Sequence, residues 1–301
     1  MIAVVTDSCA SIPPDLVSSL RIEVVPYYLH RGHEVLRDLV DISPDEFFRW
    51  LATTDRLPTT ANPGPGDYLV AFARAAQRAD QIVSISMTSK ASGAYQSACI
   101  AQEMAASQLP GVRIEAVDTL QVAMVHGWAA VEAARAAQQG AGLPQVLAIV
   151  GYVARTGCMI QTADTLRYLY MGGRIGRAQH LMGTLLNMKP IVGMEEGIIV
   201  VLGRERTRGK AYARILEMMR ERLPARAPIK VAITHVAAPE QAELLLGMVR
   251  QAFDCRETLI SQLSPVLGVH AGPGMVGVNF FPLPDETFFP VPHPINQQRE
   301  V

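Results

Sequence analysis

Short apolar runs and longer amphipathic segments alternate along most of the chain. Residues 2–5, 82–85 and 112–117 are each rich in Ile and Val and have the length of buried strands. The segment after residue 93 instead repeats alanine at helical spacing, so the chain turns from strand to helix between residues 88 and 93. Strands that alternate with helices in this way predict an α/β fold, with a mostly parallel sheet that helices cover on both faces.

The same patterns predict the remaining elements. Short helices are expected to begin near Pro13, where proline opens the first turn, and at Ser43, where acidic residues follow a cap. Other helices are expected at residues 67–79, 122–139, 164–171, 180–188, 210–222 and 240–252, and one ends near residue 155. Other strands are expected at residues 22–29, 158–161, 191–194, 198–202, 231–234, 258–261 and 276–280. The Pro- and Gly-rich stretch 57–66 is expected to be a loop.

The distribution of Gly and Pro divides the chain into three parts. Gly and Pro at residues 140–144 break the long central helix, and a new strand begins near residue 158. We therefore expect an N-terminal α/β domain at residues 1–157 and a second α/β domain at residues 158–281. The prolines after Phe281 exclude a helix or a central strand, so residues 282–301 are expected to form an extended tail.

Polar residues follow three of the predicted strands. Asp7, Thr88 and Asp118 each stand at the carboxyl end of a strand, which is where open α/β sheets bind ligands. Ser92 and Gly93 open the next helix, and backbone N–H groups at a helix N-terminus favour an anion. The alternative is that Ser92 only caps the helix and Gly93 only eases the turn.

Composition narrows the classes of function. The 301 residues are 49% hydrophobic and carry 27 basic against 28 acidic residues, a net charge of -1 that gives no long-range attraction for nucleic acid. No apolar run reaches the roughly 20 residues of a membrane span, so an integral membrane protein is not expected. The start has no secretory pattern and the four cysteines are far apart, which favours a cytoplasmic protein. His30 and His33 lack accompanying ligands, so no metal is expected.

An alternative hypothesis is that the same residues are catalytic. Ser92 as nucleophile, His270 as base and Asp118 or Asp7 as the orienting group would make a small-molecule hydrolase or acyltransferase. Against this, Ser92 lies in Lys-Ala-Ser-Gly-Ala and not in the G-x-S-x-G turn of such enzymes. The sequence also has neither a P-loop nor a dinucleotide-binding motif, so no cofactor is expected.

Several motifs occur in a fixed order over most of the chain. They are Val5-Thr6-Asp7-Ser8, Thr60-Ala61-Asn62-Pro63, Ser89-Lys90-Ala91-Ser92-Gly93-Ala94-Tyr95-Gln96-Ser97-Ala98, Thr165-Leu166-Arg167-Tyr168-Leu169 with Gly172-Gly173-Arg174-Ile175, Leu186-Asn187-Met188-Lys189-Pro190-Ile191, and His270-Ala271-Gly272-Pro273-Gly274. In this combination the chain resembles the DegV family of bacterial fatty-acid-binding proteins, which includes the fatty-acid-binding subunits of fatty acid kinase. The resemblance ends near Phe281.

The resemblance implies a ligand and the residues that hold it. A long-chain fatty acid of the C14–C18 class would lie between the two domains, with its carboxylate at Thr60, Ser92, the Gly93 backbone and His270. Met182, Leu185, Leu186 and Met188 are candidates for the wall of the tunnel, and the alternative is that each belongs to a helical core. The sequence departs from the family pattern at Ala61-Asn62, Ala91 and Ala94, which affects the neighbours of the carboxylate site but keeps Thr60 and Ser92.

The resemblance also implies a protein partner. The bound acid would be presented to a separate kinase catalytic subunit, so that this chain is a carrier with no catalytic residues of its own. Arg174, Arg204 and Arg206 are then candidates for docking the kinase. A third hypothesis is a module that docks a kinase and needs no lipid.

Overall fold

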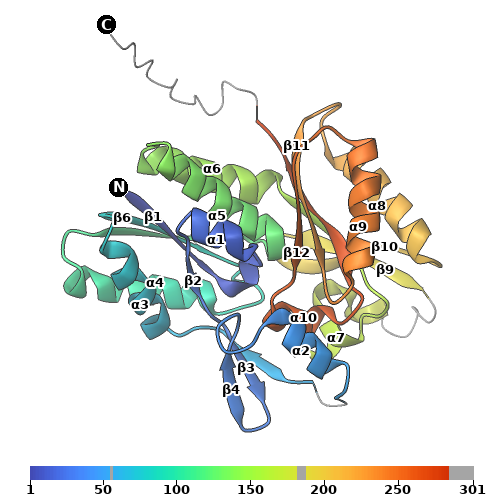
Figure 1. Ribbon diagram of the computed structural model, residues 1–301, viewed down its shortest axis with the longest axis horizontal. Coiled ribbons are helices and arrows are strands. Elements are labelled where there is room, and N and C mark those ends of the chain that lie inside the picture. The colour runs from blue at the N-terminus through green and yellow to red at the C-terminus, as the bar shows by residue number, and fades with distance from the viewer. Residues whose placement is uncertain (55–56, 182–187, 285–301) are drawn as a thin grey trace, which may run out of the picture.

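The computed structural model describes residues 1–54, 57–181 and 188–284 of the chain. Two α/β layers lie side by side, the first built from the N-terminal half and the second from the C-terminal half (Figure 1). The chain passes from one to the other between the helix that ends at Thr156 and the strand that begins at Cys158. The predicted architecture, a mostly parallel sheet flanked by helices and a second α/β unit, is confirmed.

The first sheet has four parallel strands in the order β2-β1-β6-β7. The strands are β1 (Ile2–Asp7), β2 (Glu23–Val25), β6 (Gln81–Ser86) and β7 (Arg113–Asp118). The connecting helices are α1 (Pro14–Ser19), α3 (Pro65–Ala76), α4 (Ala94–Gln108), α5 (Ala123–Gln138) and α6 (Leu143–Thr156), and a 3-10 turn η1 (Ser8–Ala10) follows β1.

Both faces of β1 are buried, which explains the uninterrupted apolar run from Ile2 to Val5. Val5 packs into the core formed with α3 and α4, whereas Val4 packs into the core formed with α5 and α6. Because successive side chains of a strand point to opposite faces, a strand covered on both sides favours apolar residues at consecutive positions.

The second sheet is mixed and has the order β10-β9-β8-β13-β11-β12. Only the β11–β12 pair is parallel. The strands are β8 (Cys158–Thr162), β9 (Lys189–Glu195), β10 (Ile198–Glu205), β11 (Ile229–His235), β12 (Cys255–Gln262) and β13 (Val276–Pro282). One face is covered by α8 (Arg208–Arg222) and α9 (Pro239–Ala252).

The other face of the second sheet packs against α5 of the first layer. Trp128 of α5 is fully buried there, and its Nε1 atom donates a hydrogen bond of 3.2 Å to the Asn279 carbonyl of β13. The same core cluster contains Val83 of the first sheet and Ala232 of the second. Helix α5 therefore ties the two layers together.

A small antiparallel sheet, β4-β3-β5, corrects two of the predictions. It is formed by β3 (Tyr28–Arg31), β4 (Glu34–Arg37) and β5 (Thr59–Ala61). The single strand predicted at residues 22–29 is wrong, because Pro26, which has no N–H to donate, separates β2 from β3. The loop predicted at residues 57–66 is also wrong in part, because Thr59–Ala61 pairs with β3.

Three short helices complete the described fold: α2 (Pro44–Leu51), α7 (Arg167–Met171) and α10 (Pro265–Ala271). The sequence did not predict α10, because Gly268 and Gly272 favour a loop. The helix is nevertheless capped, since the Ser264 side chain accepts a hydrogen bond from Leu267 N and Pro265 opens the first turn. Gly268 serves packing here: a β-carbon at this position would collide with the ring of Phe48 on α2.

Some predictions fall outside the described residues. The helix predicted at residues 180–188 lies mostly there, although its start belongs to a 3-10 helix, η2 (Gly176–Leu181). The predicted tail lies outside as well, apart from residues 282–284, of which Pro282 ends β13.

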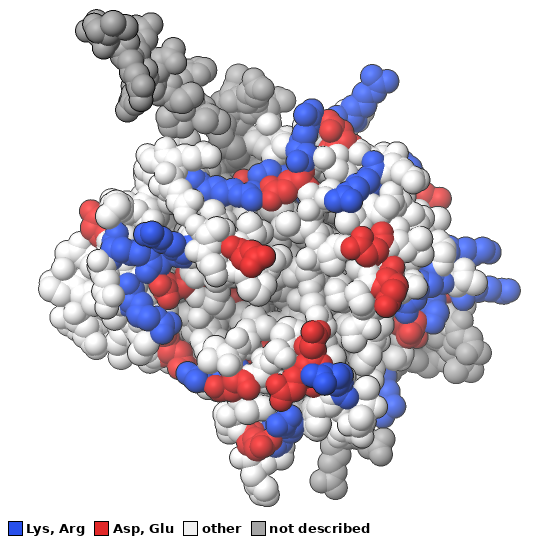
Figure 2. Space-filling view, viewed as in Figure 1, with Lys and Arg blue, Asp and Glu red and all other residues white. Residues whose placement is uncertain are grey.

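No helix in the described part of the chain combines the length and the apolar character that crossing a bilayer requires. Side chains of both signs are interspersed on the face seen in Figure 2, in keeping with the balanced composition.

Candidate functional site

A cavity of about 440 Å³ lies between the two layers and receives residues from both. A cavity of this size is in the range that binds small organic ligands. From the N-terminal half it is lined by Cys9, Tyr27, Thr60, Ala61, Asn62, Met87, Thr88, Lys90, Ala91, Ser92, Gly93, Val122 and Ala123. From the C-terminal half it is lined by Met159, Gln161, Leu169, Gly173, Arg174, Gly176, Val192, Met194, Gly197, Ile198, Ile199, Leu263, Val266, Leu267, His270, Ala271 and Met275.

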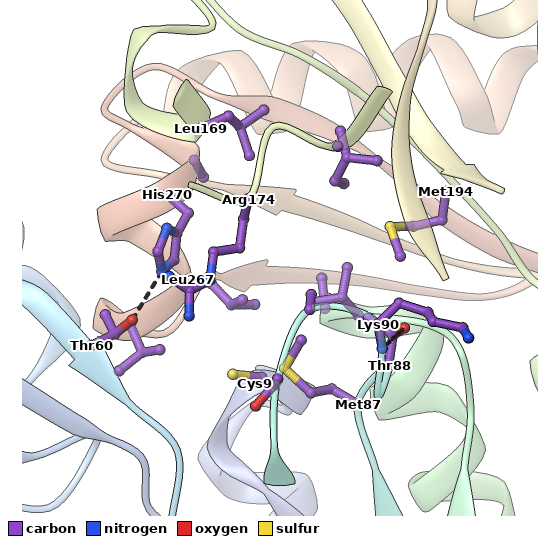
Figure 3. Close-up of a pocket in the computed structure, with 18 of the residues that line it drawn as sticks. Cys9, Thr60, Met87, Thr88, Lys90, Leu169, Arg174, Met194, Leu267 and His270 are labelled. Atoms are coloured by element: carbon purple, nitrogen blue, oxygen red, sulfur yellow. Dashed lines mark hydrogen bonds between the residues drawn. The ribbon is translucent and has the colours of Figure 1, made fainter. Parts of the chain in front are cut away.

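Thr60 and His270, which are 210 positions apart in the sequence, meet in this cavity. The Thr60 hydroxyl lies 3.0 Å from His270 Nε2, a hydrogen bond that Figure 3 marks. Pairing of β5 with β3 holds Thr60, and the capped helix α10 holds His270. The Thr60–His270 pair thus joins the small sheet of the N-terminal half to a helix of the C-terminal half.

Ser92 and Gly93 form a second polar group at the start of α4. The Ser92 hydroxyl lies 2.6 Å from the Tyr27 hydroxyl and accepts a hydrogen bond from Ala94 N. Asn62, two residues after Thr60, packs on Gly93, since a β-carbon there would lie 3.1 Å from Asn62 Oδ1. The Gly93 N–H has no acceptor among the residues that the structure describes, so it is available to an anion at the positive end of the helix dipole.

Two features set the charge of the His270 ring. Burial and, to a lesser extent, the nearby Arg174 guanidinium lower the pKa of His270 to about 4, so the imidazole is neutral near pH 7. Its Nδ1 atom is buried without a partner in the described structure and faces Gly172, where a β-carbon would collide with the ring.

The hydrogen-bond pattern then indicates which ring nitrogen carries the proton. An unpaired buried N–H is rarer in proteins than an unpaired acceptor, which assigns the proton of His270 to Nε2. The Nε2–H group donates to Thr60 Oγ1, which leaves the Thr60 hydrogen free to donate to a ligand.

Positive charge lies beside these polar groups. Arg174 extends next to His270 in Figure 3, and among described residues its guanidinium donates only to the Gly172 carbonyl, at 2.8 Å. Arg174 is exposed and also lines the cavity, so this end of the cavity is close to solvent. Hydroxyl and guanidinium donors are thus available to an anion at this end of the cavity.

The remaining wall is mostly apolar. Four methionines, at positions 87, 159, 194 and 275, contribute to it together with Leu169, Val192, Ile199 and Leu263. Thioether side chains adapt their shape to a flexible apolar ligand. The cavity therefore suits a molecule with an anionic head and a hydrocarbon body.

The turn between β9 and β10 covers one side of the cavity. Thr88, which follows β6, donates a hydrogen bond of 2.9 Å from its hydroxyl to the Gly197 carbonyl. Gly197 has φ +79°, and a β-carbon there would crowd Thr88 Oγ1, so both the backbone conformation and the close approach require glycine. This contact connects the two layers across the cavity.

The geometry does not assemble a Ser-His-Asp triad. Ser92 and His270 bond to Tyr27 and Thr60 respectively, and no hydrogen bond joins them to each other in the described structure. Asp7 is buried and accepts from Cys9 N and Met87 N. Asp118 accepts from Ser89 N and Leu120 N. Neither acid orients the imidazole of His270, as the hydrolase alternative requires.

The other predicted residues are placed as follows. Met182, Leu185 and Leu186 lie outside the described residues, and Met188 immediately precedes β9, from which Val192 and Met194 line the cavity instead. Arg204, on β10, and Arg206, just after it, are exposed and do not line the cavity. Nowhere in the described ranges do three His, Cys, Asp or Glu side chains gather as metal ligands would.

Two polar residues of the cavity went unpredicted. Tyr27 stands in an apolar stretch typical of a core strand, and nothing in the sequence indicates that its hydroxyl reaches Ser92, 65 residues away. Gln161 lies in a predicted strand, and an isolated polar residue there is more often at the surface.

Comparison with known proteins identifies relatives of the whole described chain. A protein-family model described as "Uncharacterised protein, DegV family" matches residues 1–283. The chain is 32% identical over 279 residues to the DegV domain-containing protein CPE0304 of Clostridium perfringens, which covers 93% of this chain and 98% of that one. It is 34% identical over 280 residues to the DegV domain-containing protein SCO2569 of Streptomyces coelicolor, with 92% and 97% covered.

Two solved structures share both fold and sequence with the chain. A DegV family protein of Thermus thermophilus, for which fatty acid binding is described, is 32% identical with a TM-score of 0.87, covering 94% of this chain and 99% of that one. DegV of Bacillus subtilis, described as a fatty acid binding protein, is 27% identical with a TM-score of 0.83 and the same coverage.

Proposed function

The chain belongs to the DegV family, and we propose that it is a cytoplasmic carrier that binds a long-chain fatty acid of the C14–C18 class. The acid lies between the N-terminal domain, residues 1–157, and the second domain, residues 158–281. The observation that carries this proposal is a largely apolar cavity with a cluster of hydrogen-bond donors at one end. The similar proteins of Thermus thermophilus and Bacillus subtilis bind fatty acids, which supports it.

In the proposed complex the carboxylate accepts hydrogen bonds from both layers. The Thr60 hydroxyl donates its hydrogen, because its oxygen already accepts from His270. Ser92 and the Gly93 N–H donate from the start of α4, where the helix dipole favours negative charge. A neutral His270 suits this role, because it orients Thr60 without requiring a buried charge when the cavity is empty.

The tail and the head make different contributions to binding. Each charge-assisted hydrogen bond contributes about 1.5–3 kcal/mol net, and each buried methylene about 0.8 kcal/mol. A palmitoyl chain therefore gains roughly 12 kcal/mol before ordering costs, more than any single polar contact. The acyl chain supplies affinity, and the donors fix its direction.

Mass spectrometry of the bacterially expressed protein under denaturing conditions tests this function. We expect release of a C14–C18 acid, and we expect the delipidated protein to bind palmitate on titration. Ser92→Ala should weaken palmitate binding by about 1.5–3 kcal/mol, because one charge-assisted hydrogen bond is lost. Ser107→Ala, an exposed serine on the same helix, is the matched control and should bind like the wild type. A protein that is empty and takes up no acid would contradict the proposal.

We also propose that the bound acid is presented to a separate kinase catalytic subunit. The exposure of Gly93 and Arg174 supports this proposal. Both residues line the end of the cavity where the carboxylate is proposed to bind, so a partner can reach the head group there. Arg174 is then a docking residue, and exposed Arg204 and Arg206 are further candidates.

A kinase-coupled assay tests the partner. With ATP, palmitate-loaded protein and lysate of the source bacterium, we expect acyl phosphate, which hydroxylamine traps as a hydroxamate. Arg174→Ala should reduce trapping severalfold by removing a charge that docks the kinase. Arg49→Ala is the matched control, since Arg49 is also exposed and also donates to a backbone carbonyl. Equal trapping by the wild type and Arg174→Ala would exclude Arg174 from docking, and trapping without lipid would exclude presentation.

A further inference from the structure

Gln161 is a polar residue in the apolar wall of the cavity. It stands on β8, two positions after Met159, and both side chains line the cavity while Ile160 between them faces the core under α8 and α9. Gln161 is only 4% exposed. A buried side-chain amide is costly unless its polar atoms have partners, so its position here needs an explanation.

The neighbouring strands hold this side chain in place. Gln161 pairs with Gly277 on β13, which pairs in turn with Thr234 on β11. Because a β-carbon at Gly277 would collide with Gln161 Cγ, the missing side chain gives Gln161 room to lie across β13. The Gln161 Nε2 atom reaches Thr234 Oγ1 at 3.0 Å, and Asn279 Nδ2 meets the same oxygen at 2.8 Å.

One polar atom of the Gln161 amide is left without a partner. Its Oε1 atom accepts no hydrogen bond from the described residues. Unlike the amide oxygens of Gln121 and Asn279, which are unpaired and completely buried, this atom is not completely buried. If the amide is turned over, Oε1 accepts from the Thr234 hydroxyl and Nε2 is the unpaired atom. In either orientation the amide offers one hydrogen-bonding atom to the cavity.

We propose that Gln161 selects a fatty acid that carries a hydroxyl group on its chain. The inference rests on the proposed function, because it takes the acyl chain to occupy this cavity. A hydroxyl both donates and accepts, so it satisfies the amide in either orientation. A plain hydrocarbon chain instead covers the amide and leaves it unpaired, which weakens binding. A keto group accepts only and therefore pairs with one of the two orientations.

Competition titration of the delipidated protein tests this selection. The ligands are stearate and its 2-, 3-, 10- and 12-hydroxy derivatives, since the distance from the carboxylate decides which hydroxyl meets Gln161. We expect at least one hydroxystearate to bind about three- to tenfold more tightly than stearate, the gain from one neutral hydrogen bond. In Gln161→Met this preference should be lost, because the variant binds that isomer more weakly and stearate more tightly.

The ratio of the two affinities within one variant is the decisive readout, because partial unfolding affects both ligands equally. Gln139→Met, an exposed glutamine on the protein surface, is the control and should keep the wild-type ratio. The inference is overturned if every hydroxystearate binds the wild type no better than stearate, or if Gln161→Met keeps the preference. If stearate and all four derivatives fail to bind, the proposed function falls together with this inference.

Discussion

Replacing palmitate by octanoate should weaken binding by at least a thousandfold, which is more than the loss of any single polar contact in the cavity. The replacement removes eight methylene groups, worth about 0.8 kcal/mol each when buried, and leaves the carboxylate with all its donors. The replacement therefore removes at most roughly 6 kcal/mol of binding free energy. Calorimetric titration of delipidated protein with saturated acids of increasing length measures the effect directly.

The gain in affinity per carbon atom is as informative as the total difference between palmitate and octanoate. Affinity should rise about fourfold per carbon, until the chain fills the 440 Å³ cavity, and then level off. Ser92→Ala should shift the whole series by a constant amount, because the hydroxyl contacts only the head. A series that is flat with chain length would show that the tail does not lie in the apolar part of the cavity.

Met194→Trp should abolish palmitate binding while the protein stays folded. Met194 is half-buried on β9 and its side chain points into the cavity opposite the Thr60–His270 pair (Figure 3). An indole ring in this position takes the space of the acyl chain, and the lost burial should lower affinity by more than a hundredfold, given about 0.8 kcal/mol per methylene displaced. Titration with palmitate measures the loss.

The thermal midpoint of the empty variant separates blockage from unfolding. Filling a cavity often stabilises a protein, so empty Met194→Trp should melt no earlier than the empty wild type. Met104→Trp is the matched control, because Met104 is 38% exposed on α4 and does not line the cavity. Palmitate binding to folded Met194→Trp with wild-type affinity would place the acyl chain elsewhere.

Local patterns in the sequence were enough to predict three of the four strands of the first sheet, β1, β6 and β7. These strands are rich in Ile and Val because helices cover both faces of the sheet, and this pattern is local. The carboxyl ends of the same strands also came together as expected. Asp118 at the end of β7 accepts from Ser89 N after β6, and Asp7 at the end of β1 accepts from Met87 N.

Features that depend on distant neighbours escaped prediction. Residues 265–271 carry two glycines and suggest a loop, yet Gly268 is required because α2 places Phe48 against it. Thr59–Ala61 becomes a strand only because β3 is there to pair with it. The hydrogen bond that joins Thr60 to His270 depends on both of these unpredicted elements, so geometry could not have paired them from the sequence.

The packing of α5 limits how a ligand can enter and leave. Because Trp128 is buried between the sheets and bonded to Asn279, the two halves cannot swing apart like jaws without exposing an indole to water. The β9–β10 turn is held more weakly, by the hydrogen bond from the Thr88 hydroxyl to the Gly197 carbonyl, so a small displacement of this turn opens the cavity at a lower cost. If the proposed fatty acid passes this turn, the strength of one hydrogen bond sets its residence time, and the rest of the molecule can remain rigid during exchange.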